Sequence, residues 1–167
     1  MGMDVYGIQS TNKTGEYFRA SVWSWRPVWS YVVANCSEFI DETTAKDGHG
    51  NAGAGLDKEK SKLLSKKIKE LIDSGHAQAY SETYDEQVAK AKAWNYDVEA
   101  LLGKLHLRVV AKGFNNKMSP KDYPEMESHH WWKLTDMKDN VDSYPFEIEH
   151  LKEFADFLEY SGGFEIW

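Results

Sequence analysis

The sequence predicts an α+β domain, in which a small, mainly antiparallel sheet is covered by three to four helices. Residues 3–8 alternate in polarity and carry β-branched and aromatic side chains, as strands do. Residues 164–167, at the other end, also read as a strand, and we expect the two to pair. Two amphipathic helical patterns, at residues 58–74 and 146–158, supply faces that can cover such a sheet.

Length and composition indicate one domain, residues 1–167. The chain has 167 residues, of which 41% are hydrophobic, which is enough for one core. No apolar run approaches the roughly 18 residues that a membrane span needs, so we expect no membrane contact. The single cysteine, Cys36, excludes an internal disulfide and is typical of a reducing cytoplasm.

The net charge of -7 argues against general nucleic-acid binding, because phosphates require a basic surface. The charge is nevertheless uneven, with lysines concentrated in residues 58–69 and acids in residues 136–159. Either these segments are solvated helix faces, or they attract each other or separate partners. The candidates for contact with a partner protein that has a basic surface are Glu149, Glu153 and Asp156.

The remaining elements follow from periodicity and from start and stop signals. Pro27 fits the first turn of a helix, which we expect to run to residue 39 or 40 and to end in the polar residues 41–47. Asp57 and Gly75 are suited to cap the helix at 58–74. The other expected elements are a turn at 10–15, an extended piece at 16–19, a helical region at 76–102 broken near Asn95, strands at 105–111 and 129–134, and irregular chain at 113–128.

The glycine-rich segment Asp47–Asp57 is the leading candidate for a binding loop. Residues 48–53 match G-x-G-x-x-G formally, but no buried strand precedes them and the next helix starts only after Gly55. The same segment does not match the sequence pattern of a Walker A loop or of an EF-hand calcium loop. Glycine amides next to a helix N-terminus remain able to hold an anion, unless the segment is only a flexible connection. The loop residues assigned to this site are His49, Asn51, Gly53, Gly55 and Asp57.

A second candidate feature is the crowding of Trp23, Trp25 and Trp29 around Arg26 and Pro27. Tryptophans of this kind usually fill a core. Alternatively, one or two of them, with Arg19 or Arg26, form a wall on which a planar group stacks.

Metal and nucleophile chemistry receive little support. The histidines lack H-x-x-x-H and H-E-x-x-H spacing, G-x-S-x-G is absent, and Cys36 has no activating neighbour, so we expect neither a metal nor a cofactor. If the chain is a hydrolase of phosphate or glycosidic bonds, its acid-base groups would be Asp4, His49 or Asp57.

Several short blocks, covering about half the chain, resemble a family of short uncharacterised phage and bacterial proteins. They read Gly2-Met3-Asp4-Val5-Tyr6-Gly7, Gly15-Glu16-Tyr17-Phe18-Arg19, Trp23-x-Trp25-Arg26-Pro27-x-Trp29, Asn51-x-Gly53-x-Gly55-Leu56 and Phe154-Ala155-x-Phe157-Leu158-x-x-Ser161-Gly162-Gly163-Phe164. The resemblance implies a phage or prophage origin, in which case the cytoplasm would be that of the host cell. It also implies that the loop and the aromatic block work together. Relatives often carry central cysteine pairs that suggest zinc, and this chain has none there.

We therefore expect a non-enzymatic binding protein that blocks or sequesters a host factor or a small nucleotide-like ligand. Its site would combine the glycine loop with Arg19, Trp23 and Trp25. The alternatives are the small hydrolase and a structural, oligomer-forming accessory protein.

Overall fold

A computed structural model describes residues 2–167, with the backbone alone for Asp142. The chain divides into two compact units. The first comprises the chain up to Asp85 together with Ser143–Trp167, and the second comprises Glu86–Asp142. The elements of the first unit include β1 (Gly2–Gly7), η1 (Lys13–Gly15), β2 (Tyr17–Ser21), α1 (Val22–Asn35), α2 (Glu42–Asp47), β3 (Ala54–Leu56), α3 (Lys58–Asp73), α6 (Ile148–Ser161) and β4 (Phe164–Ile166).

The sheet of the first unit has four antiparallel strands in the order β2-β1-β4-β3. The N-terminal strand pairs with the C-terminal one, with Val5 opposite Ile166, so the predicted fold class and the pairing of the two end strands are confirmed. Strand β3 was not expected from the sequence. It consists of the last three residues before Asp57, inside the segment predicted to be a loop.

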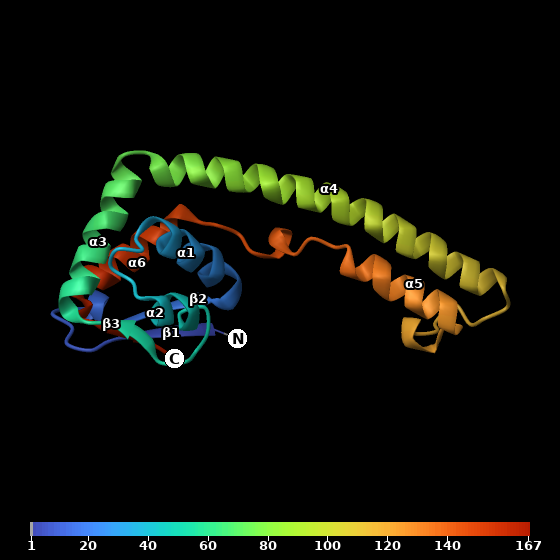
Figure 1. Cartoon of the computed structure of the whole chain (residues 1–167), viewed down its shortest axis with the longest axis horizontal. Helices are drawn as coiled ribbons and strands as arrows, with labels where there is room; N and C mark the ends of the chain where they lie inside the picture. Colours follow the sequence, from blue (N-terminus) through green and yellow to red (C-terminus); the bar gives the residue numbers. More distant parts are fainter. Residues whose placement is uncertain (1) are drawn as a thin grey trace. The chain divides into compact units, whose positions relative to one another are not determined.

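One face of this sheet is the floor of the main core. Alternate residues on the strands are buried there, and they pack beneath α1 and α6, with α3 packed against α6 (Figure 1). Phe154 of α6 is central to this layer, because its ring contacts those of Phe18, Trp25 and Phe164. The period-2 burial of the strands leaves their other side chains on the opposite face.

The predicted start of the first helix is wrong by about four residues. Helix α1 begins at Val22, where the Ser21 side chain accepts a hydrogen bond from the Ser24 amide, and Pro27 lies inside the helix. The serine cap outweighs the proline signal, because a cap satisfies an amide that would otherwise lack a partner. The helix also ends earlier than expected, and Asp41 caps a separate short helix, α2, in the polar segment.

Helices α3 and α6 agree with the sequence patterns that predicted them. Asp57 caps α3, since its Oδ1 accepts a hydrogen bond from the Lys60 amide. Helix α6 ends at Ser161 and is capped by Gly162, whose backbone is left-handed with φ of 62°. An L side chain is strained in that conformation, so the Gly162-Gly163 stop signal has a direct structural cause.

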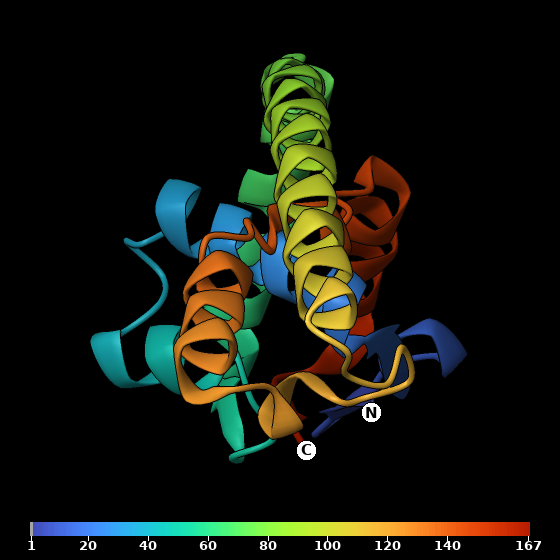
Figure 2. The same cartoon turned by 90° about the vertical axis from the view of Figure 1, so that its right-hand side faces the viewer.

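The second unit is helical, and the two strands predicted there are wrong. Helix α4 (His76–Ala111) runs from the first unit into the second without a break at Asn95, whose amide instead bonds with the backbone of Asp139. Residues 105–111 are its end, and residues 129–134 belong to α5 (Glu125–Asp136), which lies alongside α4 (Figures 1 and 2). The connecting segments contain η2 (Pro120–Asp122) and η3 (Val141–Ser143).

Burial explains these corrections, because the buried apolar residues of α4 in the second unit share one helical face rather than alternate. That face forms a separate small core of Val98, Leu102, Leu105 and Leu134, with Trp131 packed against it. A short apolar run fits a strand or a helix equally well, and the choice depends on what it packs against. In the described part of the chain, no helix is both long and apolar enough to cross a membrane.

Candidate functional site

The face of the sheet turned away from α1 and α6 presents side chains in transverse rows. In one row Tyr6 stands opposite Tyr17 on one side and Glu165 on the other, and Glu165 is opposite Gly55. We call this surface the open sheet face. The register sets its composition, because residues two apart on a strand lie on the same side.

The next row runs from Arg19 through Asp4 and Trp167 to Gly53. Asp4 is opposite Arg19, and it exchanges both backbone hydrogen bonds with Trp167, at 3.0 and 2.7 Å. The last residue of the row is Gly53, which directly precedes the edge strand β3. Its amide donates to the Ile166 carbonyl at 2.8 Å. Arg19, Asp4, Trp167 and Gly53 therefore come together from four distant parts of the sequence.

Three large aromatic residues of this face are exposed. Tyr6, Tyr17 and Trp167 keep 47%, 43% and 54% of their surface accessible, and the two tyrosine rings are 5.1 Å apart. An open face of an antiparallel sheet is ordinarily polar. Exposed aromatic groups gathered on one such face are a mark of a binding surface.

The polar groups of the face hold these rings in place. The Tyr17 hydroxyl donates to the Asp4 carboxylate, and Arg19 Nε lies 3.6 Å from Asp4 Oδ1. The Asp4 hydrogen bond raises the pKa of the Tyr17 hydroxyl. The Trp167 indole donates to Glu165 Oε2 at 3.2 Å. Rings fixed in this way lose less conformational freedom when a partner covers them.

The glycine segment shapes this face through contacts of Asn51, Gly53 and Gly55. The Asn51 side chain donates to the Gly2 carbonyl at 3.2 Å, which ties the segment to β1. Gly53 has φ of 77°, and a Cβ there would lie 3.2 Å from the Trp167 ring. Gly55 lies so close to β4 that any Cβ would overlap the Phe164 carbonyl oxygen. These residues close β3 onto β4 and leave room for Trp167.

A shallow hollow of about 420 Å³ lies at the edge of the face, lined by Gly2, Arg19, Ala20 and Ser21. Of the eight residues that the sequence assigned to the ligand site, Arg19 alone lines this hollow. Asn51 contacts Gly2, another lining residue, whereas Gly53 and Gly55 lie at the opposite edge of the sheet, on the side of β3.

Trp25 does not contribute to an exposed wall. It is fully buried, stacked on Trp29 with ring centroids 5.4 Å apart, and its indole donates to the Gly48 carbonyl at 2.7 Å. Trp29 similarly donates to the Ala45 carbonyl at 3.0 Å. The aromatic block and the glycine segment do meet, but the contact is structural, because these indoles anchor the chain that leads into β3.

Trp23 is half exposed and lies apart from these buried indoles, on the surface of α1. Its ring packs on Tyr144, with centroids 5.1 Å apart. The Arg26 guanidinium lies over the same Tyr144 ring and donates to its hydroxyl at 3.0 Å. Trp23 and Arg26 therefore clamp the segment that leads into α6.

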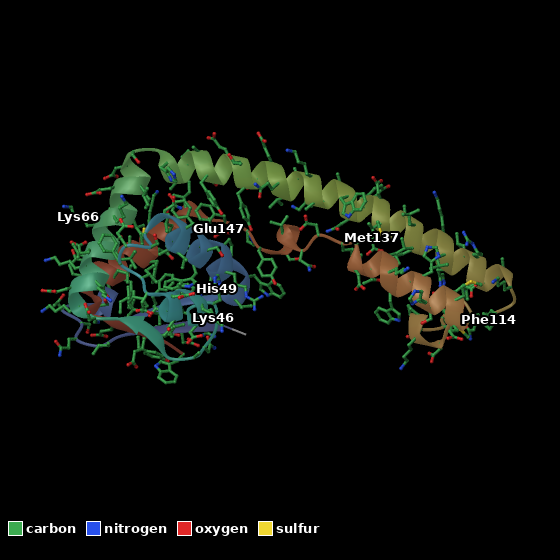
Figure 3. All side chains as sticks on the ribbon, viewed as in Figure 1. Lys46, His49, Lys66, Phe114, Met137 and Glu147 are labelled. Atoms are coloured by element: carbon green, nitrogen blue, oxygen red, sulfur yellow. The ribbon has the colours of Figure 1, made fainter. Side chains whose placement is uncertain are left out.

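His49 follows α2, near Lys46 (Figure 3). Burial, and next the Arg26 charge, lower its pKa from the ordinary value. Because the unfolded chain then binds more protons at the ring of His49, the contribution of His49 to the stability of the fold is complete above its unfolded pKa. This contribution decreases as the pH falls below the unfolded pKa.

An NMR titration of the His49 ring protons tests this shift. We expect a titration midpoint below about 6.5, and a partial rise of the midpoint in Arg26→Gln. A midpoint unchanged by Arg26→Gln would remove Arg26 as a cause.

Asp4 and Asp57, two of the three proposed acid-base groups, lie at different places along the sheet. Asp4 lies on β1, whereas Asp57 follows β3, and β4 separates these two strands by roughly 10 Å in all. Asp57 Oδ1 is occupied as the α3 cap, and Asp4 by Tyr17 and Arg19. Across residues 2–167, apart from the Asp142 side chain, no group of three or more His, Cys, Asp or Glu side chains is placed to hold a metal ion.

The acidic residues of α6 and the lysines of α3 partly neutralise each other. Lys69 Nζ lies 2.7 Å from Asp156 and 2.6 Å from Glu159. Glu149 pairs with Lys152 at 3.3 Å, and Glu153 is exposed. Lys66 projects outward from α3 (Figure 3) and lines a groove of about 760 Å³ with Lys62, Leu63 and Lys69. Lys69 in that groove is already paired within the chain.

Tyr6, Tyr17, Glu165 and Trp167 are not among the residues that the sequence assigned to a site. All four lie in segments that it expected to be extended, and the period of two shows which residues share a face. What it lacked was the strand order, which places β1 between β2 and β4.

Comparison with known proteins identifies no relative, since no protein-family model, no curated protein and no solved structure matches this chain. The class of the molecule therefore rests on its own geometry. It is an α+β unit with an open sheet face, joined through a long helix to a helical unit.

Proposed function

We propose that this chain is a non-enzymatic binding protein that holds a partner protein on its open sheet face. The observation that carries the proposal is the set of exposed aromatic rings, Tyr6, Tyr17 and Trp167, fixed by hydrogen bonds or by contact with one another. The sequence resemblance supports an accessory protein of phage or prophage origin, which would block or sequester a protein of its host.

A protein partner fits this surface better than a small ligand does. Tyrosine, tryptophan and arginine are the residues that most often dominate binding energy at protein interfaces, and Arg19 lies on the same face, two residues from Tyr17 on β2. Small molecules usually bind in concave sites that enclose most of their surface. The hollow at Arg19 is shallow and lies at the edge of the face, so it does not enclose the rings.

The charge of the face also favours a protein over a nucleic acid. Asp4 and Glu165 outnumber Arg19 there, and the whole chain carries a net charge of -7. Stacking proteins that bind single-stranded nucleic acid combine their aromatic residues with a basic groove. The open sheet face has the aromatic residues without the basic groove.

The test compares two tryptophan variants. Immobilised protein is used to capture a partner from a lysate of the source cells, and the purified partner is then titrated by calorimetry. Because Trp167 is the most exposed ring of the face, we expect Trp167→Ser to weaken binding roughly 30-fold or more. Trp132 on α5 is similarly exposed but belongs to the other unit. Trp132→Ser is the matched control, and its affinity should stay within about twofold of wild type.

Four results would contradict the proposal. Equal losses in the two variants, or no loss in Trp167→Ser, would place the partner elsewhere. Failure to capture any stoichiometric partner would also overturn it. Finally, a nucleotide that raises the melting temperature of the wild type but not of Trp167→Ser would assign the face to a small ligand instead.

A further inference from the structure

The second half of α4 carries an apolar seam with the spacing of a coiled coil. Seven residues follow one another at intervals of four and three, which is the heptad pattern of helices that pair side by side. We call them the α4 seam: Ala89, Ala93, Tyr96, Ala100, Gly103, Leu107 and Val110.

The α4 seam lies on the opposite side of the helix from the core of the second unit. The core-facing residues, such as Val98 and Leu105, are buried, whereas Tyr96 and Leu107 are 77% and 67% exposed. A Cβ at Gly103 would meet no atom within 4 Å. Val110 is half-buried, and no described part of the chain covers the other six seam residues.

The charges that flank the seam show what would fit it. The seven positions of a heptad are labelled a to g, and a and d are the core positions. In two parallel helices in register, the residue at g, just before an a position, faces the residue five places later, at e, on the other helix. Applied to α4, this rule places Lys92 opposite Asp97 of a second copy, and Glu99 opposite Lys104. By symmetry each contact occurs twice, so all four bring opposite charges together.

These flanking charges are available for such contacts. Lys92, Asp97 and Lys104 are exposed, and none of them makes an ion pair with another described side chain. Glu99 contacts Lys138 through Oε1, and its side chain remains largely exposed. An antiparallel arrangement that stacks Tyr96 on Leu107 would pair Asp97 with Lys104 but leave Lys92 without an acidic partner.

We propose that a second copy of this chain binds the α4 seam, forming a parallel, in-register helix pair. Tyr96, Leu107 and Val110 supply its apolar contacts, while the alanines and Gly103 let the helices approach closely. Since alanine and glycine bury little apolar area, association is weak and depends on concentration. The inference is independent of the open sheet face, which lies in the other unit.

Sedimentation equilibrium over a concentration series tests the pairing. We expect the wild type to move from monomer towards dimer with rising concentration, and Leu107→Glu to remain a monomer at every concentration with unchanged circular dichroism. Met126 on α5 is as exposed as Tyr96 but lies outside the seam. Met126→Glu is therefore the control and should dimerise like the wild type. A wild type that stays monomeric, or a Leu107→Glu variant that still dimerises, overturns the proposal.

A charge-swap series tests the orientation. Asp97→Lys places like charges opposite Lys92, so we expect the dissociation constant to rise about tenfold. Combining Lys92→Asp with Asp97→Lys restores opposite charges in the parallel register and should restore the affinity. If the affinity were instead restored by combining Lys104→Asp with Asp97→Lys, and not by Lys92→Asp with Asp97→Lys, the dimer would be antiparallel. That result would overturn the parallel register.

Discussion

Trp25→Ala is expected to destabilise the first unit by about 3–5 kcal/mol, whereas Trp23→Ala should cost about 1 kcal/mol or less. Trp25 is fully buried among Trp29 and Phe154, and its indole holds the Gly48 carbonyl. Trp23 is half exposed and contacts Tyr144 alone among the rings. Because the free energy of unfolding of a whole domain is only about 5–15 kcal/mol, Trp25→Ala removes a large part of it.

Urea unfolding followed by circular dichroism measures both effects, and Trp25→Phe separates the two roles of Trp25. Phenylalanine retains most of the ring packing but cannot donate to Gly48, so its cost should be intermediate, about 1–3 kcal/mol. If the Trp25→Ala variant were as stable as the Trp23→Ala variant, Trp25 could not be a core residue. Trp25 would then again be a candidate for the surface on which a planar ligand stacks.

Gly55→Ala should destabilise the pairing of β3 with β4 by about 1–3 kcal/mol, because the added methyl group must displace the Phe164 backbone. Gly50 is the matched control in the same segment. A Cβ there meets only the Asp47 carbonyl oxygen, at 3.9 Å, so Gly50→Ala should be neutral or slightly stabilising.

Amide hydrogen exchange reports this pairing locally, since the Gly53 amide bonds to the Ile166 carbonyl. We expect that amide to exchange faster in Gly55→Ala and at the wild-type rate in Gly50→Ala. Equal exchange in the two variants would show that the segment is the flexible connection that the sequence also allowed. Loss of partner binding in Gly55→Ala would further link the strand to the position of Trp167.

The glycine segment shows where sequence reasoning about the site succeeds and where it stops. The pattern Asn51-x-Gly53-x-Gly55 drew attention to the right region, because such glycines indicate that something approaches the backbone closely. In the structure, the approaching groups are the Trp167 ring and the β4 backbone, both from the far end of the chain. A contact between residues more than a hundred positions apart leaves no local sequence signal that names its partner.

Local signals were sufficient for much of the first unit. The alternation of β1, the Asp57 cap of α3 and the Gly162 stop of α6 each act within a few residues, so the sequence alone determined these elements and the α+β class. Residues 105–111 and 129–134 lacked such signals. Their helical form was decided by tertiary packing, which buries Leu105 and Leu134 in one small core.

The candidate site depended on tertiary structure for the same physical reason. Strand periodicity determines that Asp4 and Tyr6 share a face, and that Tyr17 and Arg19 do too. Only the strand order and register place these pairs opposite each other and next to Trp167. Exposure is likewise a tertiary property: Trp23 and Trp25 are two residues apart in sequence, yet the core buries one ring and leaves the other half in solvent.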